Sequence, residues 1–244
     1  KSAAKEMVEE LQNHPKHPWM PGKAYARRFV DVLRIPEIFA GIASDPKLGR
    51  EEIAVPKANL DELKSFQKNM QKQIEEILDK PVMGNNRAIV TLPTGAGKTR
   101  TVVEAIVQFL NKNGTDKNIL WIAQNREVCE QAVVCFKQIW EQKGDKSELT
   151  IWRAWDTNDI PNNDERGIIV AGIQKLSAHK DDLHHFYDRD ALSAVFIDEA
   201  HQSAAPSYWD VLDSLQMSTI LGEIHKENDH IPLIGLTATP ERRK

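Results

Sequence analysis

Short apolar runs alternate along the chain with segments in which apolar residues recur at helical spacing. Five runs are predominantly apolar on both faces, which is typical of parallel strands buried within a sheet; they cover residues 88–91, 119–123, 168–171, 195–197 and 233–236. Between the first two runs, Val102, Ile106 and Leu110 predict a helix over residues 98–112, with Gly114 as its stop. Strand, helix and strand repeated in this order predict an α/β fold with a doubly wound parallel sheet.

The first part of the chain has a different pattern. Residues 1–58 are helical in composition but are interrupted by prolines, among them Pro15, Pro18, Pro36 and Pro56. Apolar residues then recur at helical spacing over residues 63–78, which predicts an amphipathic helix. We therefore expect an N-terminal helical accessory segment over residues 1–58 and one α/β domain over residues 59–244.

Composition limits the classes of protein to consider. With 244 residues, 41% of them hydrophobic, the chain can bury one substantial core, alone or with a small appendage. The net charge of −4 is unlike that of a domain that coats nucleic acid, so any such contact must be a local patch. Cys129 and Cys135 match no metal-ligand spacing, and we expect both to be free thiols.

Targeting signals are missing from the sequence. No apolar run approaches the roughly 18 residues that span a membrane, and no signal-peptide pattern occurs. The chain begins with Lys1 and not with Met. We expect a fragment of a longer cytoplasmic protein that has no membrane partner.

A glycine-rich segment, TGAGKT, joins the first predicted strand to the first predicted helix. This context is typical of a phosphate-binding loop, in which glycines let successive N–H groups face a phosphate at a helix N-terminus. Lys98 can reach the β and γ phosphates, and the Thr99 hydroxyl can ligate Mg²⁺. The alternative is a glycine-rich turn with an incidental lysine. The residues expected to bind nucleotide here are Thr94, Gly95, Ala96, Gly97, Lys98 and Thr99.

The fourth predicted strand ends in an acidic box, Asp198-Glu199-Ala200-His201. At the carboxyl edge of a sheet, Asp198 can hold Mg²⁺ through water while Glu199 orients and deprotonates an attacking water. Adjacent carboxylates suit these two tasks because one serves the metal and the next serves the nucleophile. Taken alone, the box could equally be a helix N-terminus with capping acids.

Residues 235–240, GLTATP, follow the last strand, and Thr237 and Thr239 alternate so that both hydroxyls can face His201. The phosphate loop, the acidic box and this segment, in this order and spacing, resemble the superfamily 2 helicases and translocases of the DEAH-box kind. The resemblance covers residues 61–240. It is closest to the motor subunits of type I and III restriction enzymes and to related bacterial defence or repair helicases. Leu92 stands where the full phosphate-loop pattern has glycine, and superfamily 2 helicases commonly lack that glycine.

The resemblance implies a RecA-like P-loop NTPase domain that uses ATP and Mg²⁺. Thr237 and Thr239 would link the acidic box to nucleic-acid movement. Gln67 lies in a segment similar to the Q motif and would read the adenine edge, although Lys64 and Ser65 depart from that motif. The implied catalytic residues are Lys98, Asp198, Glu199 and His201.

Two further segments resemble the family's nucleic-acid contacts. Gln124, Asn125 and Arg126 follow the second predicted strand, where Arg126 and a helix N-terminus suit a phosphate. Gly172 and Gln174 follow the third strand, and the glycine permits close approach of a backbone. Ordinary polar loops and helix caps are the alternative at both places.

We therefore expect the first RecA-like domain of an ATP-driven helicase or translocase. Its partners would be nucleic acid, DNA rather than RNA, and a second RecA-like domain of the same parent chain. One alternative is a double-stranded-nucleic-acid translocase or sensor that does not unwind. Another is a non-hydrolysing scaffold module, against which the intact Lys98, Thr99, Asp198 and Glu199 argue.

Overall fold

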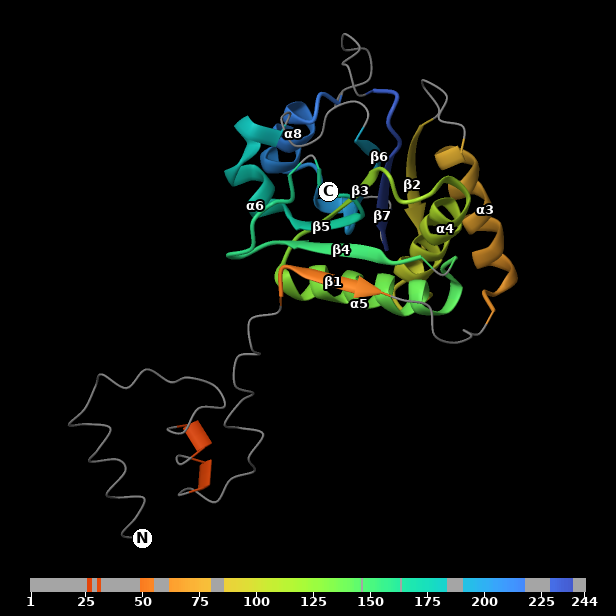
Figure 1. Cartoon of the computed structure of the whole chain (residues 1–244), viewed down its shortest axis with the longest axis horizontal. Helices are drawn as coiled ribbons and strands as arrows, with labels where there is room; N and C mark the ends of the chain where they lie inside the picture. The colour runs from red at the N-terminus through yellow and green to blue at the C-terminus, as the bar shows by residue number, and fades with distance from the viewer. Residues whose placement is uncertain are drawn as a thin grey trace, which may run out of the picture. The chain divides into compact units, whose positions relative to one another are not determined.

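A computed structural model describes residues 26, 27, 30, 31, 49–54, 62–79, 86–145, 147–162, 164–183, 191–217 and 229–238. The chain divides into two compact units, residues 1–48 and residues 49–244. The second unit is an α/β domain built on one seven-stranded sheet (Figure 1).

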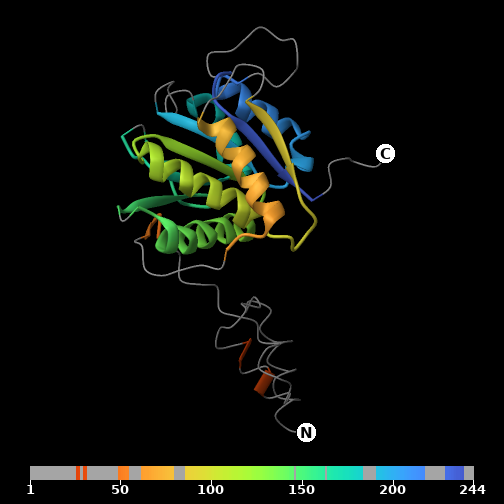
Figure 2. The ribbon, with the colours of Figure 1, turned by 90° about the vertical axis from the view of Figure 1, so that its right-hand side faces the viewer.

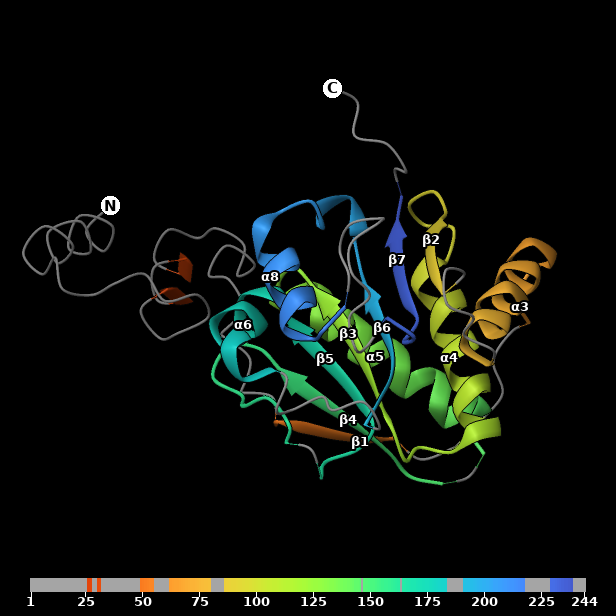
Figure 3. The same cartoon turned by 90° about the horizontal axis from the view of Figure 1, so that it is seen from above.

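The sheet has the order β1-β4-β5-β3-β6-β7-β2. Each neighbouring pair is parallel except β1 and β4, which are antiparallel. The carboxyl ends of the six parallel strands therefore lie along one edge, where ligands bind in open α/β sheets (Figure 3). The strands are β1 (Glu51–Ala54), β2 (Arg87–Thr91), β3 (Asn118–Ala123), β4 (Leu149–Ala154), β5 (Ile168–Gly172), β6 (Leu192–Ile197) and β7 (Leu233–Thr237).

Helices cover both faces of the sheet (Figure 2). One face carries α3 (Ser65–Asp79), α4 (Lys98–Asn113) and α5 (Arg126–Lys143), and the other carries α6 (Ile173–Ala178) and α8 (Pro206–Ser214). Two short 3-10 turns, η2 (Lys180–Asp182) and η3 (Ala200–Gln202), complete the described elements. Each face has its own apolar core, so the central strands are buried on both sides.

Aromatic packing fixes the centre of the sheet. Trp121 of β3 is fully buried, stacks on Phe196 of β6 at 5.8 Å and meets Phe136 of α5 edge-on at 5.5 Å. Aromatic pairs at such separations stabilise beyond their buried area. The neighbouring strands β3 and β6 therefore share one tightly packed support with α5.

The doubly wound sheet, its five predicted strands and the helix after the first strand are confirmed. Two strands, β1 and β4, were not predicted. β4 contains Arg153, which is only 3% exposed and is neutralised by Glu130 of α5 and Glu52 of β1. A charged residue in a buried strand is tolerated only with such partners, and these lie far away in the sequence. β1 also places residues 51–54, predicted as part of the accessory segment, at the edge of the sheet.

Both cysteines are free thiols, as predicted. Cys129 is buried and Cys135 is half-buried, and burial raises the pKa of each to about 12. Among the described residues, no helix is long and apolar enough to cross a membrane.

Candidate nucleotide and nucleic-acid sites

The phosphate loop connects the end of β2 to the first turn of α4. Gly95 and Gly97 both have left-handed backbone, with φ of 80° and 77°. Side chains disfavour this conformation and glycine does not, so the two glycines set the curl of the loop. Gly97 is the residue that caps α4, which places Lys98 and Thr99 in the first turn of the helix.

Gln67 of α3 lies directly against this loop. Its Nε2 donates to the carbonyl of Ala96 at 3.1 Å, and its Oε1 accepts from the N–H of Lys64 at 2.8 Å. The second bond is half of a capping box, because Gln67 is the third residue of the helix and Lys64 precedes the first. A Cβ built on Gly97 would lie 2.6 Å from Nε2, so the glycine also makes room for Gln67. The Q-motif prediction gave no sign of this contact with the loop, and adenine recognition stays a prediction.

The acidic box turns sharply away from β6. The N–H of Asp198 donates to the carbonyl of Ile122 in β3 at 2.8 Å, and the N–H of Glu199 donates to Oδ1 of Asp198 at 2.9 Å. Glu199 has φ of 50°, an uncommon conformation for a residue with a side chain. Residues held in such conformations cluster at active sites and switch regions. Asp198 is 5% exposed, and loss of hydration raises the pKa of its carboxyl group.

Side chains of the phosphate loop, the acidic box and β7 form one continuous series. Lys98 Nζ lies 3.3 Å from Glu199 Oε1, and Glu199 Oε2 lies 3.2 Å from His201 Nδ1. The hydroxyl of Thr237 lies 3.4 Å from the same His201 nitrogen. Four residues from three predicted motifs are thus brought together. Thr239 lies outside the described residues.

Gly235 lets the acidic box pack on β7. A Cβ built there would lie 2.7 Å from the Cβ of Ala200, closer than such atoms approach one another. β7 lies between β6 and β2 in the sheet, so its surface separates the acidic box from the phosphate loop. Only a glycine permits this approach. The position of Gly235 in the sequence motif did not reveal this packing role.

The residues predicted to hold Mg²⁺ fit that ion. Asp198 offers a buried carboxylate whose charged form is disfavoured by burial, and a cation would compensate that cost. Thr99 follows Lys98, whose ammonium reaches the acidic box. Mg²⁺ commonly takes one or two protein oxygens and completes its shell with water and substrate phosphates, which such a pair allows.

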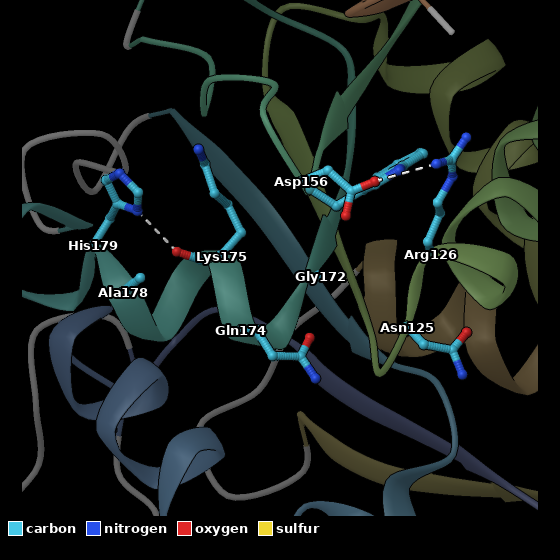
Figure 4. A pocket seen from close by; sticks show the side chains of 9 residues that line it. Asn125, Arg126, Asp156, Gly172, Gln174, Lys175, Ala178 and His179 are labelled. Atoms are coloured by element: carbon cyan, nitrogen blue, oxygen red, sulfur yellow. Dashed lines mark hydrogen bonds and ion pairs between the residues drawn. The ribbon is translucent and has the colours of Figure 1, made fainter. Parts of the chain in front are cut away.

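A separate pocket of about 360 Å³ opens where β3, β4 and β5 end (Figure 4). Four of the five residues predicted to contact nucleic acid line it, although they come from two distant segments. Gln124, the fifth, is half-buried and does not line it. The lining residues are Asn125, Arg126, Trp155, Asp156, Gly172, Gln174, Lys175, Ala178 and His179.

Local contacts shape this pocket. Asn125 caps α5 by accepting from the N–H of Val128 at 3.0 Å, which leaves Arg126 at the start of the helix. Gly172 packs against buried Trp155, whose Cβ would lie 3.3 Å from a Cβ at residue 172. Arg126 Nη1 lies 3.6 Å from Asp156 Oδ2. Trp155 and Asp156 were not predicted as site residues, because they follow β4, a strand that the sequence pattern does not indicate.

The chain matches a known protein family and is similar to a curated protein of yeast. Residues 61–242 match the family described as type III restriction enzyme, res subunit. The Saccharomyces cerevisiae protein named "Putative ATP-dependent helicase IRC3" is 32% identical over 164 residues, which cover 65% of this chain and 21% of that protein. The chain thus spans about a fifth of the length of this curated relative.

Two solved structures match this chain at 19% sequence identity, and the first of them shows a similar fold. The Pyrococcus furiosus Hef helicase domain has a TM-score of 0.51, with 74% of this chain and 34% of that chain covered. The UvsW helicase from bacteriophage T4 has a TM-score of 0.49, with 76% of this chain and 56% of that chain covered.

Proposed function

This chain belongs to the ResIII family of type III restriction enzyme res subunits, and we propose that it is the ATP-binding domain of a nucleic-acid helicase or translocase. The observation that carries the proposal is the series from Lys98 through Glu199 and His201 to Thr237. It joins a phosphate-binding cation and a catalytic carboxylate to β7, the strand that lies between β2 and β6. Binding or hydrolysis of the nucleotide can therefore alter the contacts of β7.

ATP binding would begin with an exchange at Lys98. Its side chain is only 10% exposed and its ammonium faces Glu199, so arriving β and γ phosphates compete with that carboxylate for it. Release from Lys98 leaves Glu199 held by His201 and able to accept a proton. Gln67, against the same loop, would accept and donate hydrogen bonds at the adenine edge.

Hydrolysis would follow by in-line attack of water on the γ-phosphorus. Glu199 orients the water and takes its proton as the new P–O bond forms, and the bond from phosphorus to the bridging oxygen breaks to leave ADP. Thr99 and Asp198 would hold Mg²⁺, which supplies neutralising charge for the phosphate oxygens. The phosphate-loop N–H groups bind the same oxygens at the N-terminus of α4.

Nucleic acid would bind at the pocket beyond β3, β4 and β5. Arg126 and Lys175 supply cations, and Asn125 and Gln174 supply polar groups for a sugar-phosphate backbone. We propose DNA rather than RNA as the partner. A second RecA-like domain of the same protein would close over the nucleotide and supply an arginine to the transferring phosphoryl group, an effect worth roughly 10³–10⁵ in rate elsewhere.

The test is a pair of assays on the complete protein. ATP hydrolysis should depend on Mg²⁺ and be stimulated by DNA, and displacement of a labelled strand then separates a helicase from a translocase that does not unwind. Retained ATP binding with no hydrolysis under any condition would instead indicate a scaffold module. Greater stimulation by RNA would overturn the choice of DNA.

A further inference from the structure

Asp156 is the single carboxylate among the nine residues that line the pocket, all of them within the described part of the chain. Its carboxylate is turned toward Arg126, with Oδ2 3.6 Å from Nη1 (Figure 4). Both side chains are about half exposed, at 54% and 45%. The pair is therefore open to solvent and can be broken by a competing ion.

The backbone holds Asp156 in this position. The N–H of Asn158 donates to the carbonyl of Trp155 at 3.1 Å, which closes a turn around residue 156. Asp156 has φ of 52° in that turn, in the left-handed region that favours glycine and asparagine. Asparagine or glycine would suit this conformation at least as well, so the turn alone does not explain a carboxylate here.

When a backbone phosphate enters the pocket, Arg126 is already paired with the carboxylate of Asp156. At Nη1 of Arg126 the phosphate competes with the Asp156 carboxylate, which also repels it. This inference rests on the proposed function. We propose that Asp156 lowers the affinity of this domain for backbone phosphate by forming an ion pair with Arg126 when no nucleic acid is bound. A motor must release each phosphate as it advances, and an internal anion that recaptures the arginine makes that release easier.

The first test is Asp156→Asn in the complete protein. Asparagine keeps the size of the side chain and tolerates the backbone, but removes the charge. We expect affinity for single-stranded DNA, measured by fluorescence anisotropy at low salt, to rise by up to about fivefold, the size expected for one exposed charge contact. Because Arg126 would no longer be neutralised, the slope of log affinity against log salt should steepen by up to about 0.7. Asp159→Asn is the matched control, since Asp159 is exposed in the same loop but does not line the pocket.

The second test is Arg126→Ala in the wild-type and Asp156→Asn backgrounds. The loss of affinity should be larger in the variant background, and the gain from Asp156→Asn should disappear without Arg126. Asp156→Gly, which suits the same backbone, should reproduce the gain and guards against a folding defect in the first variant.

The remaining outcomes overturn the inference in distinguishable ways. If Arg126→Ala weakens binding but neither Asp156 variant tightens it, the pocket binds DNA and the role of Asp156 is wrong. Weaker binding by Asp156→Asn would make the carboxylate a direct acceptor for the nucleic acid. If no pocket variant changes affinity, the proposed nucleic-acid site itself fails. If Asp159→Asn raised DNA affinity equally, the effect would come from the change in net charge and not from the position of Asp156.

Discussion

The ammonium of Lys98 lies 3.3 Å from Oε1 of Glu199, although 101 positions separate the two residues in the sequence. The strands that precede them, β2 and β6, are not neighbours, because β7 runs between them. The contact thus spans β7, and it needs both the reach of Lys98 and the close approach of the acidic box allowed by Gly235.

Replacing Lys98 with alanine should weaken ATP binding. The lysine makes a charge-assisted contact worth roughly 1.5–3 kcal/mol, so we expect a loss of about ten- to a hundredfold in affinity. Isothermal titration with ATP and Mg²⁺ measures it. Lys112→Ala is the control, because Lys112 lies in the last turn of the same helix and pairs with Asp79. Equal affinity in the Lys98 variant and the wild type would remove Lys98 from the site.

Replacing Glu199 with glutamine should separate binding from hydrolysis. Glutamine keeps the shape of the side chain but cannot take a proton from water, so hydrolysis should fall by roughly 10²–10⁴-fold. ATP affinity should stay the same or rise, because the carboxylate no longer competes for Lys98. Single-turnover hydrolysis and equilibrium binding measure the two effects. If the variant hydrolysed ATP near the wild-type rate, another group would have to activate the water.

Replacing Gln67 with alanine should narrow the preference for ATP over GTP, because the lost interaction is with the base. The measurement is the ratio of the two affinities. Gln71→Ala, one turn further along α3, is the control. A parallel loss of affinity for both nucleotides would mean that Gln67 acts only by supporting the phosphate loop through Ala96.

Replacing Gly235 with alanine should displace the acidic box. The new methyl group would lie 2.7 Å from the Cβ of Ala200, and overpacking of this kind costs about 1–3 kcal/mol of stability. We expect a lower melting temperature and reduced hydrolysis. Gly49→Ala is the control, since its Cβ would make only ordinary contact at 3.6 Å. Unchanged melting and activity would contradict the role of Gly235.

Much of the fold and of the nucleotide site follows from local pattern. The strands that lead to the phosphate loop and the acidic box are apolar, and the chemistry of Lys98 and Glu199 follows directly after them. The resemblance to superfamily 2 and to type III restriction-enzyme motor subunits is confirmed by the family match, whereas the DEAH-box kind stays a prediction.

Features that depend on distant partners were not predictable. β4 was missed because Arg153 interrupts its apolar pattern, and the partners that neutralise Arg153 come from α5 and β1. Because β4 was not predicted, Asp156, which follows β4 and lines the pocket, was not predicted as a site residue either. The support of the phosphate loop by Gln67 depends on how α3 packs beside α4, which no local pattern encodes.

The most direct test of the proposed function is the steady-state ATPase rate of the complete protein with and without DNA, set beside its Glu199→Gln variant. We expect Mg²⁺-dependent hydrolysis that DNA stimulates in the wild type and that is nearly abolished in the variant. A wild-type rate that DNA leaves unchanged, or a variant that retains the stimulated rate, would contradict it.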